Sequence, residues 1–390
     1  MNNYFADLHI HIGASANGKP VKITASNNLT FENIVRESND RKGLDMIGII
    51  DCASPRVQQD IEDMLNKGDI KEIKGGGFQY KDEMVIIPGA EVESREENGG
   101  MVHYLAYFPY LDNLKEFTDI MDQYITNVNL SSQVTGLTGS QILKITKAAG
   151  GIMVIAHAFT PHKSFYGNAF KSYREVFSKK EWNSIPAIEL GLSADANLAD
   201  HLHELNEKSF LSNSDAHSVP KIAREYNIVR MENLSFEELK LTLFRKDNRR
   251  ILANYGLDPR LGKYHRSYCP DCNKKFTAEK AVKKCPNCGK ELIMGVKDRI
   301  LDIADQKINH PDHRGEYIYQ IPLLDIPGIG DKTLQKLLNE FGNEMEVIHH
   351  TDLSELKKVL NSSLAKKIDK ARKGEAKILS GGGGNYGKMI

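Results

Sequence analysis

The chain has 390 residues, of which 40% are hydrophobic and 27% are charged, a balance typical of globular proteins rather than disordered ones. This length predicts two or three domains. The longest apolar run, near residues 151–159, is much shorter than the roughly 20 residues that a membrane helix needs. The first residues lack the basic and apolar pattern of a secretory signal, so we expect a cytoplasmic protein without a membrane partner.

Charge is unevenly distributed along the chain. Lys and Arg number 52, as do Asp and Glu, so the formal net charge is zero. Residues 260–300 nevertheless hold 11 basic against 4 acidic side chains, and residues 356–390 hold 9 against 2. This pattern is expected where carboxylates bind metal ions in one part and another part binds a nucleic-acid backbone. The odd number of cysteines, five, argues against a disulfide framework.

Short β-rich runs alternate with longer polar segments over the first 230 or so residues. Between the first two runs, Thr30 is expected to cap a helix that carries Ile34 and Val35, and Gly43 to end it. The alternation predicts a parallel α/β fold, and the apolar runs suit strands covered on both faces. The predicted strands are residues 5–10, 46–50, 84–87, 101–108, 152–156, 187–190, 210–211 and 227–230.

The pattern changes after residue 255. Four of the five cysteines then follow in two close pairs, residues 315–379 are wholly helical in pattern, and the last segment includes four consecutive glycines. We therefore expect an α/β domain over 1–255, a zinc-binding module over 256–300, a helical domain over 301–379 and a flexible tail over 380–390.

Candidate metal ligands stand at or near the ends of the predicted strands. In a closed parallel barrel the working residues lie at the carboxyl ends of the strands, where the loops bring them together. Imidazoles and carboxylates bind zinc, manganese or iron when deprotonated. The candidates are His9, His11, Asp51, Glu91, His103, His157, Asp215 and His217.

The spacing of these residues favours a centre with more than one ion. His9 and His11 are two residues apart, so both rings lie on one face of an extended segment. Glu91 can bridge to a second ion, and two ions about 3.5–4 Å apart are the usual machinery for displacement at phosphorus. A single histidine at a strand end is more often structural, but the recurrence favours a metal centre. Glu189 is compatible with either role, and four histidines are interpreted as structural: His201, His203, His349 and His350.

These motifs resemble those of the polymerase and histidinol phosphatase (PHP) superfamily. The matching residues are Asp7-Leu8-His9-Ile10-His11, Glu91, His103, His157 and Ser214-Asp215-Ala216-His217. The resemblance implies a distorted seven-stranded β/α barrel that holds two or three metal ions. It implies that one ion is bound by His9, His11, Glu91 and Asp215, and that Glu91 bridges to a second, held by His103 and His157. Asp215 and Glu91 would be the catalytic residues, and His217 would belong to a third site.

The sequence departs from the superfamily pattern at this third site. Many members have Asp-His after the second strand, where this chain has Asp51-Cys52, and Asn17 stands where another histidine often occurs. Cys52 is either a soft metal ligand or, as we favour, a small buried residue at a strand end. Whether a third ion binds stays open.

The paired cysteines predict a structural zinc site. Cys269 and Cys272 are separated by two residues, as are Cys285 and Cys288, with twelve residues between the pairs. Four thiolates close the coordination sphere of zinc against water, so catalysis is not expected here. Five lysines nearby either contact phosphates or are simply solvated: Lys274, Lys275, Lys280, Lys283 and Lys284.

A glycine-rich turn followed by an amphipathic helix resembles the helix-hairpin-helix motif of DNA repair proteins. Gly328 and Gly330 allow a sharp turn that exposes amide groups at the start of the helix, and Lys332 adds a positive charge. Such amides bind phosphate regardless of the base. A plain helical turn is the alternative. The basic side chains that would extend the contact are Lys366, Lys367, Lys370, Arg372 and Lys373.

The order of these parts is similar to that of the endonuclease Q family, and the similarity extends to about residue 379. It implies a DNA repair nuclease that uses divalent metal ions: zinc, or magnesium or manganese for activity. Members cut the phosphodiester bond on the 5′ side of a deaminated base (uracil, hypoxanthine, xanthine) or of an abasic site, in double- or single-stranded DNA. The tail lacks the Gln-x-x-apolar-x-x-aromatic-aromatic motif by which archaeal members contact the sliding clamp, so we do not expect that partner.

An extruded base would be read in a pocket beside the metals. Phe165 and Tyr166 follow the His157 strand and are candidates for stacking on it, although packing of this loop on the barrel is an equal alternative. Two other functions remain open. One is a small-molecule phosphatase like histidinol phosphatase, for which the C-terminal third has no evident use. The other is a non-catalytic DNA-binding protein, which the nearly complete ligand set disfavours.

Overall fold

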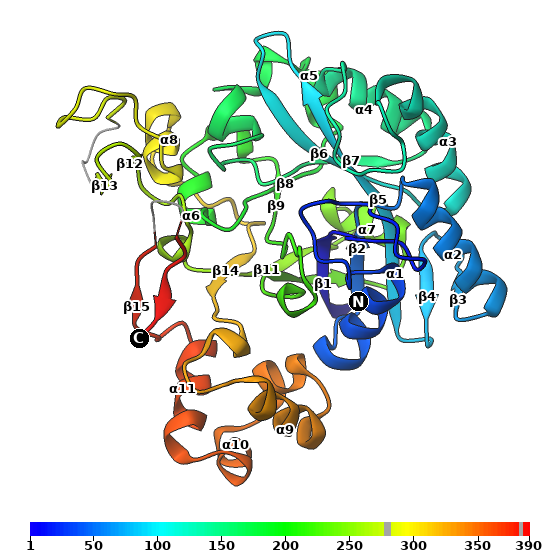
Figure 1. The fold of residues 1–390 in the computed structure, drawn as a ribbon, viewed down its shortest axis with the longest axis vertical. Coiled ribbons are helices and arrows are strands. Elements are labelled where there is room, and N and C mark those ends of the chain that lie inside the picture. The colour runs from blue at the N-terminus through cyan, green and yellow to red at the C-terminus, as the bar shows by residue number, and fades with distance from the viewer. Residues whose placement is uncertain (277–281, 382–384) are drawn as a thin grey trace.

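The computed structural model describes residues 1–276, 282–381 and 385–390, and a mixed β-sheet of twelve strands runs through its body (Figure 1). The strands of this sheet are β1 (Asn2–Ile10), β2 (Met46–Ile49), β3 (Ile70–Glu72), β4 (Phe78–Tyr80), β5 (Met84–Arg95), β6 (Met101–Tyr107), β7 (Ile152–Ile155), β8 (Ala187–Glu189), β9 (Ser209–Leu211), β10 (Tyr226–Met231), β11 (Arg250–Gly256) and β14 (Glu316–Tyr319).

The strands follow the order β14-β11-β10-β1-β2-β5-β6-β7-β8-β9, with β3 and β4 branching from β5. The predicted α/β class is confirmed, but the sheet is mixed rather than parallel. β1, β2 and β5 are parallel, as are β7, β8 and β9, but β6 runs antiparallel to both of its neighbours, and β10 is antiparallel to β1. The cause for β6 is the short link from β5, because a hairpin reverses the chain whereas a parallel strand needs a long crossover.

The sheet curls until the chain beyond β9 returns to β1. Ala216 forms a parallel bridge with Ile10, and the side chain of Asn213 accepts a hydrogen bond from the amide of Leu8 at 3.1 Å. Asn227 on β10 donates to the carbonyls of Ser212 and Ala6 at 3.0 and 3.2 Å. These amide side chains satisfy backbone groups where the strand ladder is irregular, and they bring the segment after β9 beside the end of β1.

Helices cover the sheet. They are α1 (Phe31–Arg36), α2 (Pro55–Lys67), α3 (Leu111–Met121), α4 (Gly139–Ala148), α5 (Lys179–Asn183), α6 (Ala196–Ala199) and α7 (Phe236–Leu243), with shorter 3-10 or π turns η1 (Glu37–Lys42), η2 (Asp122–Tyr124), η3 (Phe165–Ala169), η4 (Tyr173–Glu175), η5 (His203–Leu205) and η6 (Val219–Lys221). The predicted cap of α1 is confirmed, because Thr30 accepts from the amide of Asn33, and Gly43 ends the continuing turn with a left-handed backbone. Among the described residues, no helix is long and apolar enough to cross a membrane.

Two apolar clusters fill the two sides of the curled sheet. The larger one joins the sheet to the outer helices and includes Ile34, Val57 and Phe117. The smaller one includes Leu8 of β1 and Leu239 of α7. Side chains of one strand therefore divide between two cores, as expected for strands with both faces covered.

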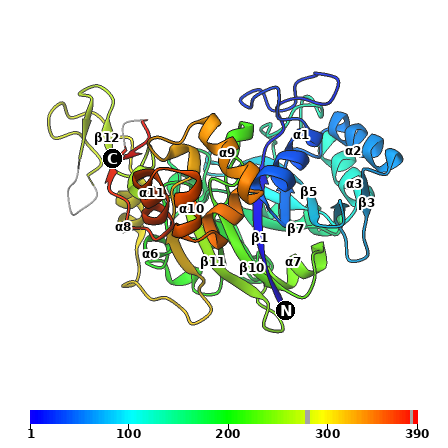
Figure 2. The same cartoon turned by 90° about the horizontal axis from the view of Figure 1, so that it is seen from below.

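The C-terminal third adds a cysteine-rich segment and a group of helices. Its elements are η7 (Pro259–Leu261), β12 (Tyr268–Cys269), β13 (Lys274–Lys275), α8 (Val296–Ile303), η8 (Leu323–Asp325), α9 (Asp331–Phe341), η9 (Glu346–His350), α10 (Leu353–Val359), α11 (Ser362–Arg372), β15 (Ile378–Leu379) and β16 (Lys388–Met389). Seen from below, helices α9, α10 and α11 lie in front of β10 and β11 (Figure 2), and they share a third apolar cluster. A buried ion pair, Lys42 with Glu344 at 2.7 Å, joins them to η1.

The prediction that residues 315–379 are wholly helical was wrong at two points, residues 316–319 (β14) and residues 378–379 (β15). Residues 316–319 form β14, which pairs in parallel with β11. Their sequence, Glu-Tyr-Ile-Tyr, is rich in the aromatic and β-branched residues that favour strands. Near the end of the chain, β16 pairs with β15, and Met389 is buried. Flexibility of the tail, over 380–390, stays a prediction, and residues 382–384 lie outside the described part.

Glu225, which precedes β10, carries a buried carboxyl group with an altered pKa. One of its oxygens accepts from the amide of Leu257 at 2.7 Å, and the other is buried without a hydrogen-bond partner among the described residues. Burial raises its pKa from 4.5 to about 8. The folded state therefore holds a proton that the unfolded state releases above about pH 4.5.

We predict that Glu225 makes the folded state less stable as the pH rises. Stability from the protonated carboxyl is fully present below the unfolded pKa and is lost at about 1.4 kcal/mol per pH unit up to the folded pKa. Glu225→Gln should remove this slope between pH 5 and pH 8, measured by urea unfolding. The exposed Glu340→Gln serves as the control, and an equal slope in the Glu225 variant and the wild type would contradict the prediction.

Candidate metal centre

His9, His11 and Asp215 form the first group of ligand atoms. His9 and His11 stand at and just beyond the end of β1, and their Nε2 atoms are 3.3 Å apart. Asp215 follows β9, and its Oδ1 lies 3.5 Å from His9 Nε2 and 3.2 Å from His11 Nε2. The closure of the sheet beside β1 brings these distant parts of the sequence together. Their spacing allows all three to contact one ion.

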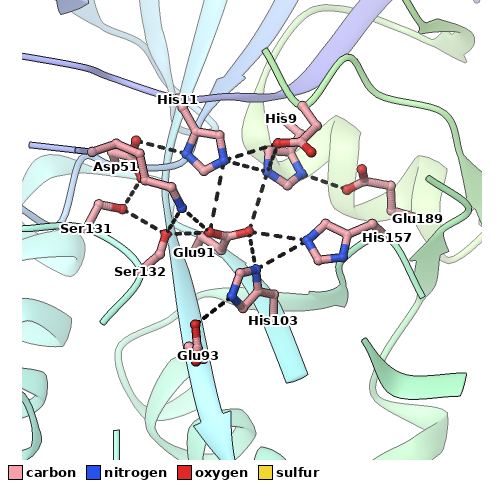
Figure 3. Close-up of polar contacts among 12 residues, drawn as sticks. His9, His11, Asp51, Glu91, Glu93, His103, Ser131, Ser132, His157 and Glu189 are labelled. Carbon is pink, nitrogen blue, oxygen red and sulfur yellow. Dashed lines mark hydrogen bonds and ion pairs between the residues drawn. The ribbon is translucent and has the colours of Figure 1, made fainter. Parts of the chain in front are cut away.

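Glu91, His103 and His157 form the second group (Figure 3). Glu91 lies on β5, His103 on the neighbouring β6, and His157 just after β7. Glu91 Oε1 is 2.8 Å from His103 Nδ1 and 3.5 Å from His157 Nε2. The same atom is 3.7 Å from His9 Nε2, so the Glu91 carboxylate lies between the two groups. All six ligands of the two implied metals are thus brought together.

Three of the imidazoles are held by carboxylates through their other ring nitrogen. The pairs are His9 Nδ1 with Glu189 at 2.8 Å, His11 Nδ1 with Asp51 at 3.0 Å and His103 Nε2 with Glu93 at 2.9 Å. Such partners fix the tautomer and orientation of metal-binding histidines. This arrangement leaves the facing nitrogens free for an ion, and it gives Glu189 a supporting role that its position in the sequence left open.

The electrostatics of the site favour cations. Burial alone would lower the pKa of His9, but Glu189, Asp215 and Glu91 raise it to about 10. Burial would likewise raise the pKa of Glu91, but His103 and Lys22 hold it well below 4.5. The Glu91 carboxylate therefore stays ionised, and the neighbouring acids favour a proton on His9. Divalent ions would compete for the same nitrogens.

Two ligand residues have unusual backbones. Asp215 has a φ of 45° and His157 a φ of 25°. Residues other than glycine rarely have a positive φ. Strain of this kind is common where a side chain must be aimed into a functional site.

The residues linked to a third ion are dispersed. His217 lies beside the first group, with its ring 4.3 Å from that of His11, and its side chain is 36% exposed. Asp51 is committed to the His11 ring, the amide of Ile12 and the hydroxyl of Ser131. Cys52 is fully buried in the larger apolar cluster, as we favoured. Asn17 is exposed and accepts from Ser15, and a third ion stays a prediction that rests on His217.

Several polar residues of the site gave no signal in the sequence. Lys22 reaches Glu91 Oε2 at 2.7 Å from the loop after β1, and the Ser132 hydroxyl contacts the same oxygen from the loop before α4. Lys163 lies 2.7 Å from Glu93. These residues lie in irregular loops without periodicity, so only their spatial position identifies them. Lys22, Ser132 and Lys163 line a cavity of about 340 Å³ in front of the two ligand groups.

A second, smaller hollow of about 140 Å³ adjoins His157 and Asp215. Its wall includes Ser193, Tyr264 and Tyr386. Phe165 and Tyr166 are not part of it. Both are fully buried in an aromatic cluster, so neither ring has a free face in this structure.

The four paired cysteines converge as predicted. Cys269 Sγ is 3.6 Å from Cys288 Sγ, and Cys285 Sγ is 3.7 Å from Cys272 Sγ. All four sulfur atoms lie within 4.8 Å of one another, which suits tetrahedral zinc. Lys274 and Lys275 are exposed on β13, whereas Lys280 lies outside the described residues.

The glycine-rich turn precedes α9 and is exposed. Gly328 has a φ of 102°, which a glycine adopts readily. Gly330 is the residue before the helix, and Lys332 lies exposed in its first turn. Leu334, Leu337 and Leu338 of the same helix are buried in the third apolar cluster. The turn is thus anchored by its helix, while Gly328 and Gly330 themselves are exposed.

Comparisons with known proteins extend over the whole chain, although no family model matches it. Protein YqxK of Bacillus subtilis (strain 168) is 42% identical over 393 residues, which is 100% of both chains. The lesion-specific endonuclease PfuEndoQ of Pyrococcus furiosus has a TM-score of 0.84 and 31% identity, over 100% of this chain and 95% of that one. Endonuclease Q in complex with a 27-mer duplex that carries an abasic lesion at its active site has a TM-score of 0.84 and 32% identity, over 100% of this chain and 96% of that one. The chain therefore belongs to the endonuclease Q family.

Proposed function

We propose that this protein is a DNA repair endonuclease that uses divalent metal ions to cut the phosphodiester bond on the 5′ side of a lesion. The lesions are deaminated bases, namely uracil, hypoxanthine and xanthine, and abasic sites. The observation that carries the proposal is the pair of ligand groups that share Glu91. The likeness to a lesion-specific endonuclease, and to an endonuclease Q bound to DNA with an abasic lesion, supports the same substrate class.

The ligand sets fit two divalent ions. One would be bound by His9, His11, Asp215 and Glu91, and the other by Glu91, His103 and His157. When bound, such ions activate water as the nucleophile and neutralise charge on the phosphate and the leaving oxygen. We propose His217, at the exposed rim of the first group, as the ligand that a third ion would require.

The protein's own residues supply orientation and a water-excluding site. Glu189, Asp51 and Glu93 keep the imidazoles of His9, His11 and His103 aimed at the ions, as their short contacts support. The ligand side chains of both groups, except the partly exposed Asp215 and His157, are almost fully buried. Electrostatic interactions are stronger in such surroundings than in water.

We propose that the C-terminal third holds the duplex. The exposed residues Gly328 and Gly330, together with the exposed Lys332, suit a helix-hairpin-helix contact with phosphates. The basic residues of α11 and the exposed lysines of β13 would extend it.

We propose the units 1–255, 256–300, 301–379 and 380–390 for the catalytic domain, the zinc module, the DNA-binding domain and the tail. The zinc ion would be structural, because four thiolates leave no open position.

The 140 Å³ hollow is our proposed site for the extruded base. It adjoins His157 and Asp215, so a base placed there keeps the neighbouring phosphate near the ligands. Tyr264 offers a ring for stacking, and Ser193 offers a hydroxyl for hydrogen bonding. This hollow replaces the earlier candidates Phe165 and Tyr166, whose rings are fully buried.

We predict cleavage of lesion duplexes that depends on metal and on Asp215. Duplexes with uracil, hypoxanthine, xanthine or an abasic site should be cut only 5′ to the lesion, and a duplex with no lesion should stay intact. A chelator should stop the reaction. Asp215→Asn should slow cleavage by at least about 100-fold, because even supporting residues of metal ligands cost 10–100-fold. Duplex binding, measured by fluorescence anisotropy, should persist.

The exposed Asp119→Asn is the control for that experiment. Cleavage by Asp215→Asn at the normal rate would refute the assignment of the centre. Hydrolysis of sugar or amino-alcohol phosphates without any DNA cleavage would favour the small-molecule phosphatase instead.

We predict that Tyr264→Ala separates base-containing lesions from abasic ones. Stacking on an aromatic ring is worth about 1–3 kcal/mol per base, so cleavage at uracil should fall by about tenfold. Cleavage at an abasic site, which has no base to stack, should change little. The measured quantity is the ratio of kcat/KM for the two duplexes, with the exposed Tyr124→Ala as the control. An unchanged ratio would rule out stacking on Tyr264.

We predict that the four cysteines bind zinc independently of the active site. Cys272→Ser combined with Cys285→Ser should remove zinc from the module and weaken duplex binding, because thiolate ligation stabilises such small modules. Elemental analysis should show the loss, while metal at the catalytic centre remains. Cys52→Ala is the matched control, since this cysteine lies in the apolar core, and loss of zinc from it alone would contradict the assignment.

A further inference from the structure

Lys22 is a buried cation placed among the metal ligands, and neither of the two proposed ions uses it. Its side chain is only 12% exposed, and its Nζ lies 2.7 Å from Glu91 Oε2 and 2.5 Å from Ser132 Oγ. Burying an ammonium group costs several kcal/mol unless the group is paired. Glu91 and Ser132 supply the partners that the Lys22 ammonium group needs.

The loop that carries Lys22 is fixed by backbone hydrogen bonds. The amide of Lys22 donates to Ile12 at 2.9 Å, and that of Val21 donates to Gly13 at 2.9 Å. The amide of Ser131 donates to Val21 at 3.0 Å, which ties the second loop to the first. Lys22 and Ser132 are thus held against each other by the main chain of both loops.

The two oxygens of Glu91 have different neighbours. Oε1 faces His103, His157 and His9 at 2.8, 3.5 and 3.7 Å. Oε2 faces Lys22, and His11 is 4.0 Å away. The ammonium group therefore lies on the side of the first ligand group, away from His103 and His157.

The position of Lys22 leaves part of its binding capacity open. An ammonium group has three N–H donors, and Glu91 and Ser132 account for two among the described residues. Lys22 lines the 340 Å³ cavity in front of the ligand groups. A donor at this wall suits an anionic oxygen that enters the cavity.

A simple counter-ion for Glu91 is the competing interpretation. Glu91 already contacts the imidazoles of His103 and His157, and bound divalent ions would neutralise it without Lys22. A lysine that only neutralised Glu91 would also not need to line the cavity, as Lys22 does. The Asp51 carboxylate, where the superfamily pattern implies a further ion, is fully committed to His11, Ile12 and Ser131. Lys22 thus provides, as part of the chain, a positive charge on this side of the site.

We propose that Lys22 is a phosphate-binding residue whose ammonium group, positioned by Glu91 and Ser132, donates to a non-bridging oxygen of the scissile phosphate. The proposal rests on the proposed function, since it deepens the account of how that site holds a phosphodiester. Lysine suits this role as a compact charge that binds phosphate without a demand for planar geometry.

Lys22→Met, Lys22→Arg and the exposed Lys19→Met of the same loop test this proposal. Each protein is loaded with metal, its metal content is measured by elemental analysis, and inorganic phosphate is titrated by calorimetry without DNA. We expect Lys22→Met to weaken phosphate binding at least tenfold while its metal content matches the wild type. Lys22→Arg should retain most of the affinity, and Lys19→Met should behave as the wild type.

Two results would overturn the proposal. One is unchanged phosphate affinity in Lys22→Met, and the other is loss of metal from that variant, which would make Lys22 a support for Glu91 alone. If Lys22→Met fails to fold, as judged by circular dichroism, Lys22→Gln takes its place as the variant without the charge, with the same expected loss of phosphate binding. The titration needs no DNA cleavage, so it can fail while lesion duplexes are cut normally. Conversely, Lys22-dependent phosphate binding without cleavage of any duplex would refute the proposed function only.

Discussion

The contact of one carboxylate with two groups of imidazoles organises this molecule. Glu91 is buried on β5 and meets His103 and His157 through the same oxygen, which also approaches His9. A buried carboxylate is costly unless it is paired, and these imidazoles together with Lys22 pair it without any metal. The closure of the sheet completes the site, because it brings Asp215 beside His9 and His11.

The surrounding carboxylates extend this arrangement by one further layer. Glu189, Asp51 and Glu93 each hold one imidazole from behind, and the excess of negative charge raises the pKa of His9 to about 10. The folded protein thus concentrates cations at one point, which suits a centre that must bring an anionic DNA backbone close to acidic side chains.

The convergence of the candidate metal ligands was predictable from the sequence, whereas the positions of their neighbours were not. Histidines and acids are the residue types that bind metals, and these ones stand at or near strand ends. Their convergence could therefore be expected once an α/β fold was predicted. Lys22 and Ser132 lie in irregular loops, where no periodicity reports on position. Strand direction was missed at β6 because alternation of strands and helices does not reveal a short hairpin link. Phe165 illustrates another limit, since aromatic character does not distinguish a ring at a pocket from a ring in the core.

The parallel pairing of β14 with β11 makes the C-terminal third part of the main sheet. A chain that stopped near residue 255 would leave β11 as an unprotected edge, with its backbone donors and acceptors open to pairing with another molecule. Residues 1–255 are therefore unsuited to excision as a separate fragment, because the strand that covers their sheet edge lies some sixty residues further along the chain. Any insertion into the C-terminal third, or loss of it, must therefore preserve that strand.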